Sequence, residues 1–161
     1  MSAATQAADD IAAELNVATN GPGGPWGVVF TAAQKWEPYF SLSPSTGDIP
    51  QITTDPVVSV IPDSTPQNSV GTRGLQVEDQ NVMIVLQVAV TDDSNATIDP
   101  WAALLEKIKD WFFDPKYAHW VGTVQRQRAV AVEVGTYCYR PHLQDFRIYT
   151  GALTITMRVW R

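Results

Sequence analysis

The sequence is poor in several residue types, and each shortage excludes a class of protein. It holds one cysteine, Cys138, so it lacks the thiol pair of an internal disulfide and the thiolates of a multi-cysteine metal site. Such a chain is expected in a reducing cytoplasm, with Cys138 a buried or half-buried thiol rather than a reactive one. No apolar run approaches the roughly 18 to 20 residues that span a bilayer. Met1 to Ala8 contain no basic residue and no apolar stretch, so they do not predict a signal peptide.

Positive charge is also scarce. The chain has 11 Lys and Arg against 17 Asp and Glu, which gives a formal net charge of −6. Proteins that hold nucleic acid tightly neutralise phosphates with Lys and Arg, so general DNA binding is not expected. An acidic surface past which DNA slides without sticking agrees with this balance, as do most cytoplasmic proteins.

Sequence patterns for catalysis or cofactor binding are missing. There is no Gly-x-Ser-x-Gly, no P-loop and no dinucleotide fingerprint. His119 and His142 are isolated, and the turn at Pro141 favours a surface or interface role for His142. We therefore predict no catalytic residue, no cofactor and no metal, and keep a small ligand-binding domain or enzyme as a distant alternative. Acidic pairs are expected at ordinary solvated positions: Asp9-Asp10, Glu78-Asp79 and Asp92-Asp93.

What the chain does contain is apolar patterning for one domain, residues 1–161. Helical spacing predicts a short first helix from Ala8 to Leu15, followed by a Gly- and Pro-rich linker. A second helix is predicted with Asp99 as its N-cap and Pro100 as its first residue. It should end at Asp114-Pro115, because the residue before a proline disfavours helical geometry.

Runs of β-branched and alternating apolar residues predict the strands. The run at 81–90 is apolar on both faces, with only Gln87 polar, so we place it centrally. Residues 139–145 are interpreted as a connection. The order of elements predicts an α+β sandwich, an antiparallel sheet flanked by two helices. The predicted strands are 26–33, 57–61, 81–90, 129–134 (with Val130, Val132 and Val134 on one face) and 148–160 (with Leu153, Ile155, Met157 and Val159 inward).

Two segments are candidates for contacts with a partner. Residues 63–74 are too polar for the core, and we predict that they form a long extended hairpin or arm that leaves the domain body. Residues 35–42 are aromatic and interrupted by a proline, and for these aromatics core packing is the equal alternative. The candidate contact residues are Trp36, Tyr39, Phe40, Asp63, Ser64, Gln67, Asn68 and Arg73.

The C-terminal run Tyr139 to Trp160, YRPHLQDFRIYTGALTITMRVW, resembles a family of small bacteriophage and prophage proteins, the tail terminators or tail-completion proteins. Members of this family end in a proline- and leucine-containing connection, a central Arg-Phe or Phe, and a Leu-Thr-x-Thr-x-Arg-Val strand. Other pieces of the chain that resemble the family occur in the same order: IAAELN at 11–16, WEPYFSL at 36–42, VSVIP at 58–62, IVLQVAV at 84–90 and LLEKI at 104–108.

The resemblance implies a sheet flanked by two helices, with a long hairpin arm that reaches the neighbouring subunit. It implies a structural virion protein whose ring, hexameric in this family, caps the tail tube, ends tail polymerisation and joins the tail to the head. The implied partners are further copies of the chain, the tail tube protein and the head–tail connector or neck proteins. DNA is implied only as cargo that passes through the lumen of the ring, and the resemblance implies no membrane partner. The expected location is the tail or neck of the virion, after assembly in the host cytoplasm; the related alternative is another neck component, a head-completion or connector-adaptor protein.

Overall fold

The chain folds as an α+β protein around one mixed sheet. The computed structural model describes residues 2–18, 24–41, 52, 54–63, 67–72, 75–113, 121–122 and 126–160, with the backbone alone at 17–18, 67–72 and 75–76. Five strands follow the order β1-β2-β4-β6-β5, and β3 pairs with the first part of β4. The elements within these residues are α1 (Ala3–Ala18), β1 (Thr31–Gln34), β2 (Val57–Pro62), β3 (Gln67–Thr72), β4 (Leu75–Ala89), α2 (Asn95–Phe113), β5 (Arg126–Thr136), α3 (Arg140–Phe146) and β6 (Ile148–Trp160).

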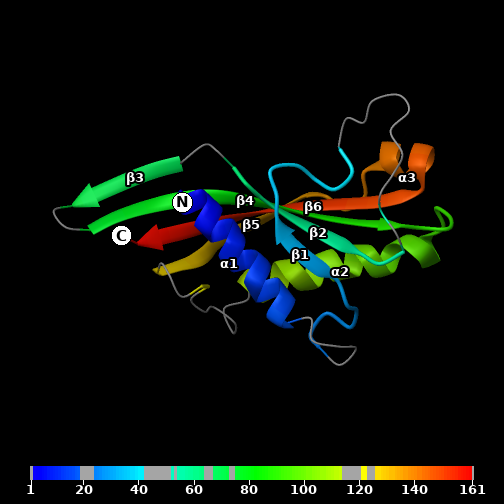
Figure 1. The fold of residues 1–161 in the computed structure, drawn as a ribbon, viewed down its shortest axis with the longest axis horizontal. Helices are drawn as coiled ribbons and strands as arrows, with labels where there is room; N and C mark the ends of the chain where they lie inside the picture. The colour runs from blue at the N-terminus through cyan, green and yellow to red at the C-terminus, as the bar shows by residue number, and fades with distance from the viewer. Residues whose placement is uncertain are drawn as a thin grey trace.

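The helices divide the sheet into two unequal faces. Figure 1 shows α1 and α2 on one side and the short α3 on the other, at the end of the sheet far from the C-terminus. The main core lies under α1 and α2, because alternate residues of each strand point that way. Its centre is a set of fully buried side chains from both long strands and both helices: Ile84, Leu86, Leu153, Ile155, Met157, Ile11, Leu15, Leu105 and Ile108.

Several strand predictions are confirmed. β6 spans the predicted residues 148–160, and its four predicted inward residues are buried while Thr154, Thr156 and Arg158 are half-buried on the other face. β2 covers the predicted strand and also includes Pro62. β4 lies between β2 and β6, as its two apolar faces predict, but it begins at Leu75 because its first residues pair with β3.

The prediction of an antiparallel sheet was wrong in one respect, because β1 pairs with β2 in parallel. The strand predicted at 26–33 also begins only at Thr31, because Trp26 turns inward. Its indole N–H donates to the carbonyl of Leu15 at 3.2 Å, and its ring lies 5.6 Å from that of Trp111. The residues before Thr31 therefore pack into the main core instead of forming a strand.

The number of helices also differs from the predicted two. Residues 139–145, interpreted as a connection, contain α3, which Arg147 ends in the left-handed region at φ 55°. A helix of two turns buries too few residues to leave a clear periodic signal. α1 extends beyond the predicted 8–15, since the hydroxyl of Ser2 accepts the amide of Thr5 at 3.2 Å and caps an earlier start.

α2 begins four residues before the predicted N-cap, Asp99. The carboxylate of Asp92 accepts the side chain and backbone N–H of Ser94 and the hydroxyl of Thr97, and these bonds lower its pKa to about 2. This turn fixes the helix start at Asn95 and leaves Pro100 inside the helix. The predicted end at 114–115 lies outside the described residues; within them the helix ends at Phe113.

β5 is longer and less regular than predicted. Ala129 pairs with Met157 while Ala131 pairs with Thr156, so Val130 is the extra residue of a bulge. The bulge breaks the alternation, and Val130 does not share the core contacts of the two later valines. The residues that pack against the main core are Ala129, Val132 and Val134.

Candidate assembly surfaces

The aromatic segment combines exposed and buried rings. Trp36 is 66% exposed and Tyr39 is 36% exposed, and the ammonium of Lys35 lies 3.9 Å above the centroid of the Tyr39 ring. For Phe40 the alternative of core packing holds. Phe40 is buried on the α3 side of the sheet, with its ring 4.9 Å from that of Phe146. The segment is therefore anchored by one ring and leaves two others exposed.

A side-chain amide holds this segment on the sheet. Gln87, fully buried on β4, accepts the amide N–H of Phe40 at 3.0 Å and donates to the carbonyl of Phe40 at 2.8 Å. It thus makes both hydrogen bonds that a neighbouring strand would make. The hydroxyl of Ser59 on β2 accepts the amide of Tyr39 at 3.3 Å. These contacts place the exposed rings at a fixed position above the sheet.

His142 lies beneath the same segment. The sequence favoured a surface or interface position, but the side chain is fully buried. Its Nδ1 lies 2.7 Å from the hydroxyl oxygen of Thr150, and within the described residues Nε2 has no hydrogen-bond partner. Burial lowers the pKa of His142, and the backbone of Ser41 opposes this shift in part. The imidazole is therefore neutral near pH 7 and acts as a packing group.

Within the predicted arm at 63–74, residues 67–72 form β3, which includes Gln67 and Asn68 and pairs with the first part of β4 as an antiparallel hairpin. The exposed Asp63 continues the pairing of β2 with β4, because its amide donates to the carbonyl of Asn81 at 2.9 Å. Figure 1 shows the hairpin reaching past the start of α1, at the end of the sheet where the C-terminus lies. Ser64 and Arg73, like His119, lie outside the described residues.

Polar side chains occupy the sheet where the hairpin joins it. Asp79 on β4 receives two hydrogen bonds from the guanidinium of Arg158 on β6, at 2.8 and 2.9 Å. Two register positions further along, the hydroxyl of Thr156 donates to the side-chain oxygen of Asn81 at 2.9 Å. Both pairs lie on the face that α1 and α2 leave open. This face is polar here, so a partner would meet charged and amide groups beside the hairpin.

A half-buried carboxylate joins α1 to β5. Asp10 was expected in solvent, but it accepts the side-chain amides of Gln6 at 3.0 Å and Gln127 at 2.5 Å. Burial raises its pKa, the bond from Gln6 opposes this, and the charge of Asp9 adds to it. Gly122 packs directly on this carboxylate. The cluster is structural, because both oxygens are engaged within the fold.

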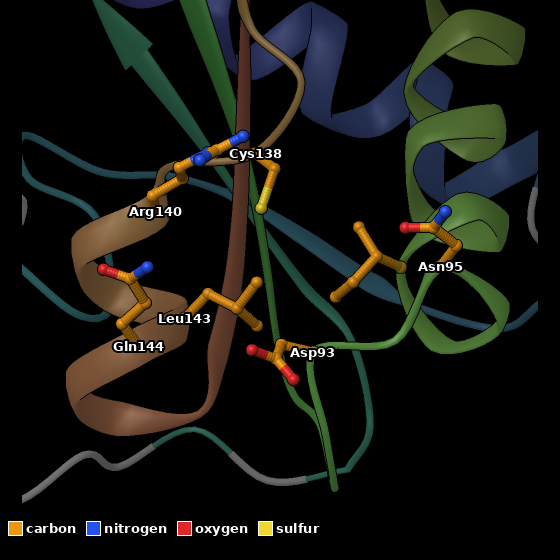
Figure 2. A pocket seen from close by; sticks show the side chains of 7 residues that line it. Asp93, Asn95, Cys138, Arg140, Leu143 and Gln144 are labelled. Carbon is orange, nitrogen blue, oxygen red and sulfur yellow. The ribbon is translucent and has the colours of Figure 1, made fainter.

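A small cavity of about 260 Å³ lies between α3 and the start of α2. Figure 2 shows Leu143 of α3 directed toward the turn that carries Asp93 and the start of α2. The thiol of Cys138 is half-buried as predicted; burial raises its pKa, opposed by Arg140, so it is a weak nucleophile near neutral pH. The lining residues are Asp93, Asn95, Ile98, Cys138, Arg140, Leu143 and Gln144.

Within the part of the chain that the structure describes, no three His, Cys, Asp or Glu side chains gather where they could hold a metal ion. No described helix is both long and apolar enough to span a bilayer. Sequence reasoning missed the docking role of Gln87, although a single glutamine among the apolar residues of β4 is a signal that a buried polar group has a specific partner.

No protein-family model matches the chain, and no curated protein matches it either. Its function is therefore inferred from its own surfaces and from the resemblance in its sequence. The candidate surfaces are the β3–β4 hairpin, the polar face beside it and the exposed rings of Trp36 and Tyr39.

Proposed function

We propose that this chain is a structural subunit of a bacteriophage tail terminator, a ring that caps the tail tube, ends its polymerisation and joins the tail to the head. The observation that carries the proposal is the β3–β4 hairpin, which leaves the layered body at one end of the sheet. A sheet with helices and a hairpin arm is also what the C-terminal resemblance implies.

A ring requires two different surfaces on each subunit. A head-to-tail contact joins one patch to another, and it closes when the rotation between neighbours divides a full turn. The hairpin and the aromatic segment meet this requirement, since they lie at separate places on the sheet (Figure 1). We assign the hairpin to the contact with the neighbouring subunit, with the rings of Trp36 and Tyr39 as anchors on a second surface.

The buried polar groups support a binding role. Gln87 and Asp10 direct their hydrogen bonds into the fold, where they position segments rather than face a substrate. The half-buried Cys138 thiol is protonated near neutral pH. In this proposal the function is binding alone: one face of the ring fits the tube, the other fits the connector, and DNA passes through the lumen of the ring.

The proposal is tested on polymerising tail tubes. Tube protein is assembled with and without a substoichiometric amount of the purified chain, and tube lengths are measured in negative stain. A terminator shortens the tubes and labels one end of each. Unchanged lengths, with no chain bound to tubes, would refute the proposal. Binding to connector rings but not to tubes would instead identify a head-completion or adaptor protein.

A further inference from the structure

The cage around His142 suits a neutral ring and not a charged one. Aromatic rings surround the imidazole edge-on, Phe40 and Tyr139 each with centroids at 4.8 Å and Phe146 at 6.5 Å. The polar neighbours are the hydroxyl of Thr150 and the backbone of Ser41. An imidazolium donates from both nitrogens, and within the described residues Nε2 has no hydrogen-bond partner.

The charged side chains of the neighbouring elements do not provide a counter-ion. On α3, Arg140 and Asp145 are exposed, and Arg147 at its end pairs with Asp93 at 3.6 Å. β6 contributes Thr150 and β4 contributes Gln87, neither of which is charged. Among the described residues, no carboxylate hydrogen-bonds to either ring nitrogen. A proton on this ring therefore places a charge in the cage that has no counter-ion among the described residues and that the backbone of Ser41 stabilises only in part.

The cage is coupled to the aromatic segment in two ways. Phe40 is itself one wall, and its backbone is bonded to Gln87. The Nε2 of Gln87 also lies 3.4 Å from the hydroxyl of Thr150, the group that bonds to His142. When His142 takes a second proton, Nδ1 must donate to Thr150, so that hydroxyl can no longer donate to the ring. Hydrating the charged ring requires Phe40 to move away.

We infer that His142 is an acid-sensitive latch: the neutral imidazole holds residues 36–41 on the sheet, and its protonation releases them with Trp36 and Tyr39. The inference concerns the single chain and goes beyond the proposed function, so either can fail without the other. Release and proton uptake are linked. Because the released histidine binds a proton more readily than the caged one, protection of the segment falls as pH drops below the ordinary histidine pKa of about 6.5.

The test is amide hydrogen exchange of Tyr39 and Phe40 by NMR at pH 7.5 and pH 5.0, corrected for the intrinsic dependence on pH. Wild-type protection at Phe40 is expected to fall by about tenfold or more, because pH 5.0 lies about 1.5 units below the ordinary pKa of about 6.5 that the released histidine regains. His142→Asn keeps a polar atom near Thr150 but does not titrate, and its protection is expected to change less than threefold. An equal fall in His142→Asn, or unchanged protection in the wild type, overturns the inference.

A second measurement does not depend on that variant folding. The chain has two histidines, so His119→Gln leaves one imidazole to follow by NMR. Its titration and the loss of Phe40 protection are expected to share one midpoint, below the ordinary histidine value. If the imidazole titrates at or above that value, or if Phe40 stays protected while it does, the latch is refuted.

Discussion

At the scale of single residues, two side-chain amides make the backbone hydrogen bonds that a neighbouring strand would otherwise make. Asn16 donates to the carbonyl of Ala32 at 2.8 Å and accepts its amide at 2.9 Å, as Gln87 does for Phe40. A primary amide carries a donor and an acceptor side by side, which matches the backbone of one extended residue. Each amide therefore satisfies a residue that has no strand beside it.

Replacing Gln87 with Leu removes both bonds to Phe40 and leaves its buried N–H and carbonyl unpaired. At about 1–3 kcal/mol for each of these two unpaired groups, unfolding in urea should show a loss of about 2–6 kcal/mol. Gln34→Met is the matched control, because the side-chain nitrogen of Gln34 is buried without a hydrogen-bond partner in the described structure. We expect that variant to lose less than about 1 kcal/mol. Equal losses in the two variants would contradict the role given to Gln87.

Two glycines with positive φ give a second comparison. At Gly27 (φ +71°) an added Cβ would meet Nζ of Lys107 at 3.9 Å, an ordinary contact, whereas the Cβ of an alanine at Gly122 (φ +77°) would clash with the carboxylate of Asp10. Gly27→Ala should cost about 1–2 kcal/mol, the cost of the left-handed conformation alone. Gly122→Ala should cost about 1–3 kcal/mol more through the clash. Thermal unfolding of the two variants measures the difference; a Gly122→Ala variant no less stable than Gly27→Ala would contradict this packing.

Asp10 gives a prediction with a defined sign in pH. Burial raises its pKa, so between 3.8 and the raised value the folded state binds more protons than the unfolded state. Its contribution to stability therefore falls as pH rises through that window. Asp10→Asn removes this dependence, and its stability relative to the wild type should increase from pH 3.5 to pH 7 in urea titrations. The control is Asp99→Asn, an exposed acid of α2; a relative stability of Asp10→Asn that falls with pH would refute the assignment.

At the scale of elements, the sequence predicts those whose signal is local and long. β6 is buried throughout 148–153 and then alternates buried and half-buried residues to Trp160, so its apolar pattern sets its limits and, in the second half, its faces. β2 is found from its β-branched run, and β4 from a run that is apolar on both faces. The resemblance to the tail-terminator family rests largely on the same apolar runs.

The elements that the sequence did not predict depend on contacts between distant residues. β1 is parallel to β2 and short, and its edge is satisfied by Asn16, 16 positions earlier. α3 is too short for a periodic pattern, and the start of α2 follows from the bonds of Asp92 rather than from Pro100. The burial of Phe40 and His142 comes from packing between the segment, α3 and β6. None of these contacts has a local signal.

The outer edge of β1 is protected by a side chain of α1. Ala32 is paired on its outer side by Asn16, so this side of the sheet is closed to further strands. Asn16→Leu leaves the edge N–H and carbonyl free to pair with another chain. We expect lower stability by about 1–3 kcal/mol and concentration-dependent aggregates in light scattering. Asn16→Asp keeps the acceptor for the amide of Ala32 and should be intermediate; an Asn16→Leu variant as stable and monodisperse as the wild type would contradict this role.

At the scale of the whole molecule, the body and the hairpin are separable. The buried clusters formed by the described side chains draw on α1, α2, β1, β2, β4 and β6, and β3 pairs with β4 beside the main path of the sheet. Disrupting β3 should therefore leave the body folded. Ser69→Pro/Val70→Pro removes two consecutive amides from β3, and a strand with two prolines cannot keep its pairing with β4. We expect its melting temperature to stay within a few degrees of the wild type in calorimetry.

The most direct test of the account is the solution mass of the wild type and of this hairpin variant by light scattering across a concentration series, with negative-stain images of the same samples. We expect the wild type to rise from the chain mass of 17.7 kDa toward about six copies, as closed rings, and the hairpin variant to remain a folded monomer. Rings formed equally by both proteins would contradict the role of the hairpin. A wild type that stays monomeric at every concentration and on purified tail tubes would contradict the ring itself.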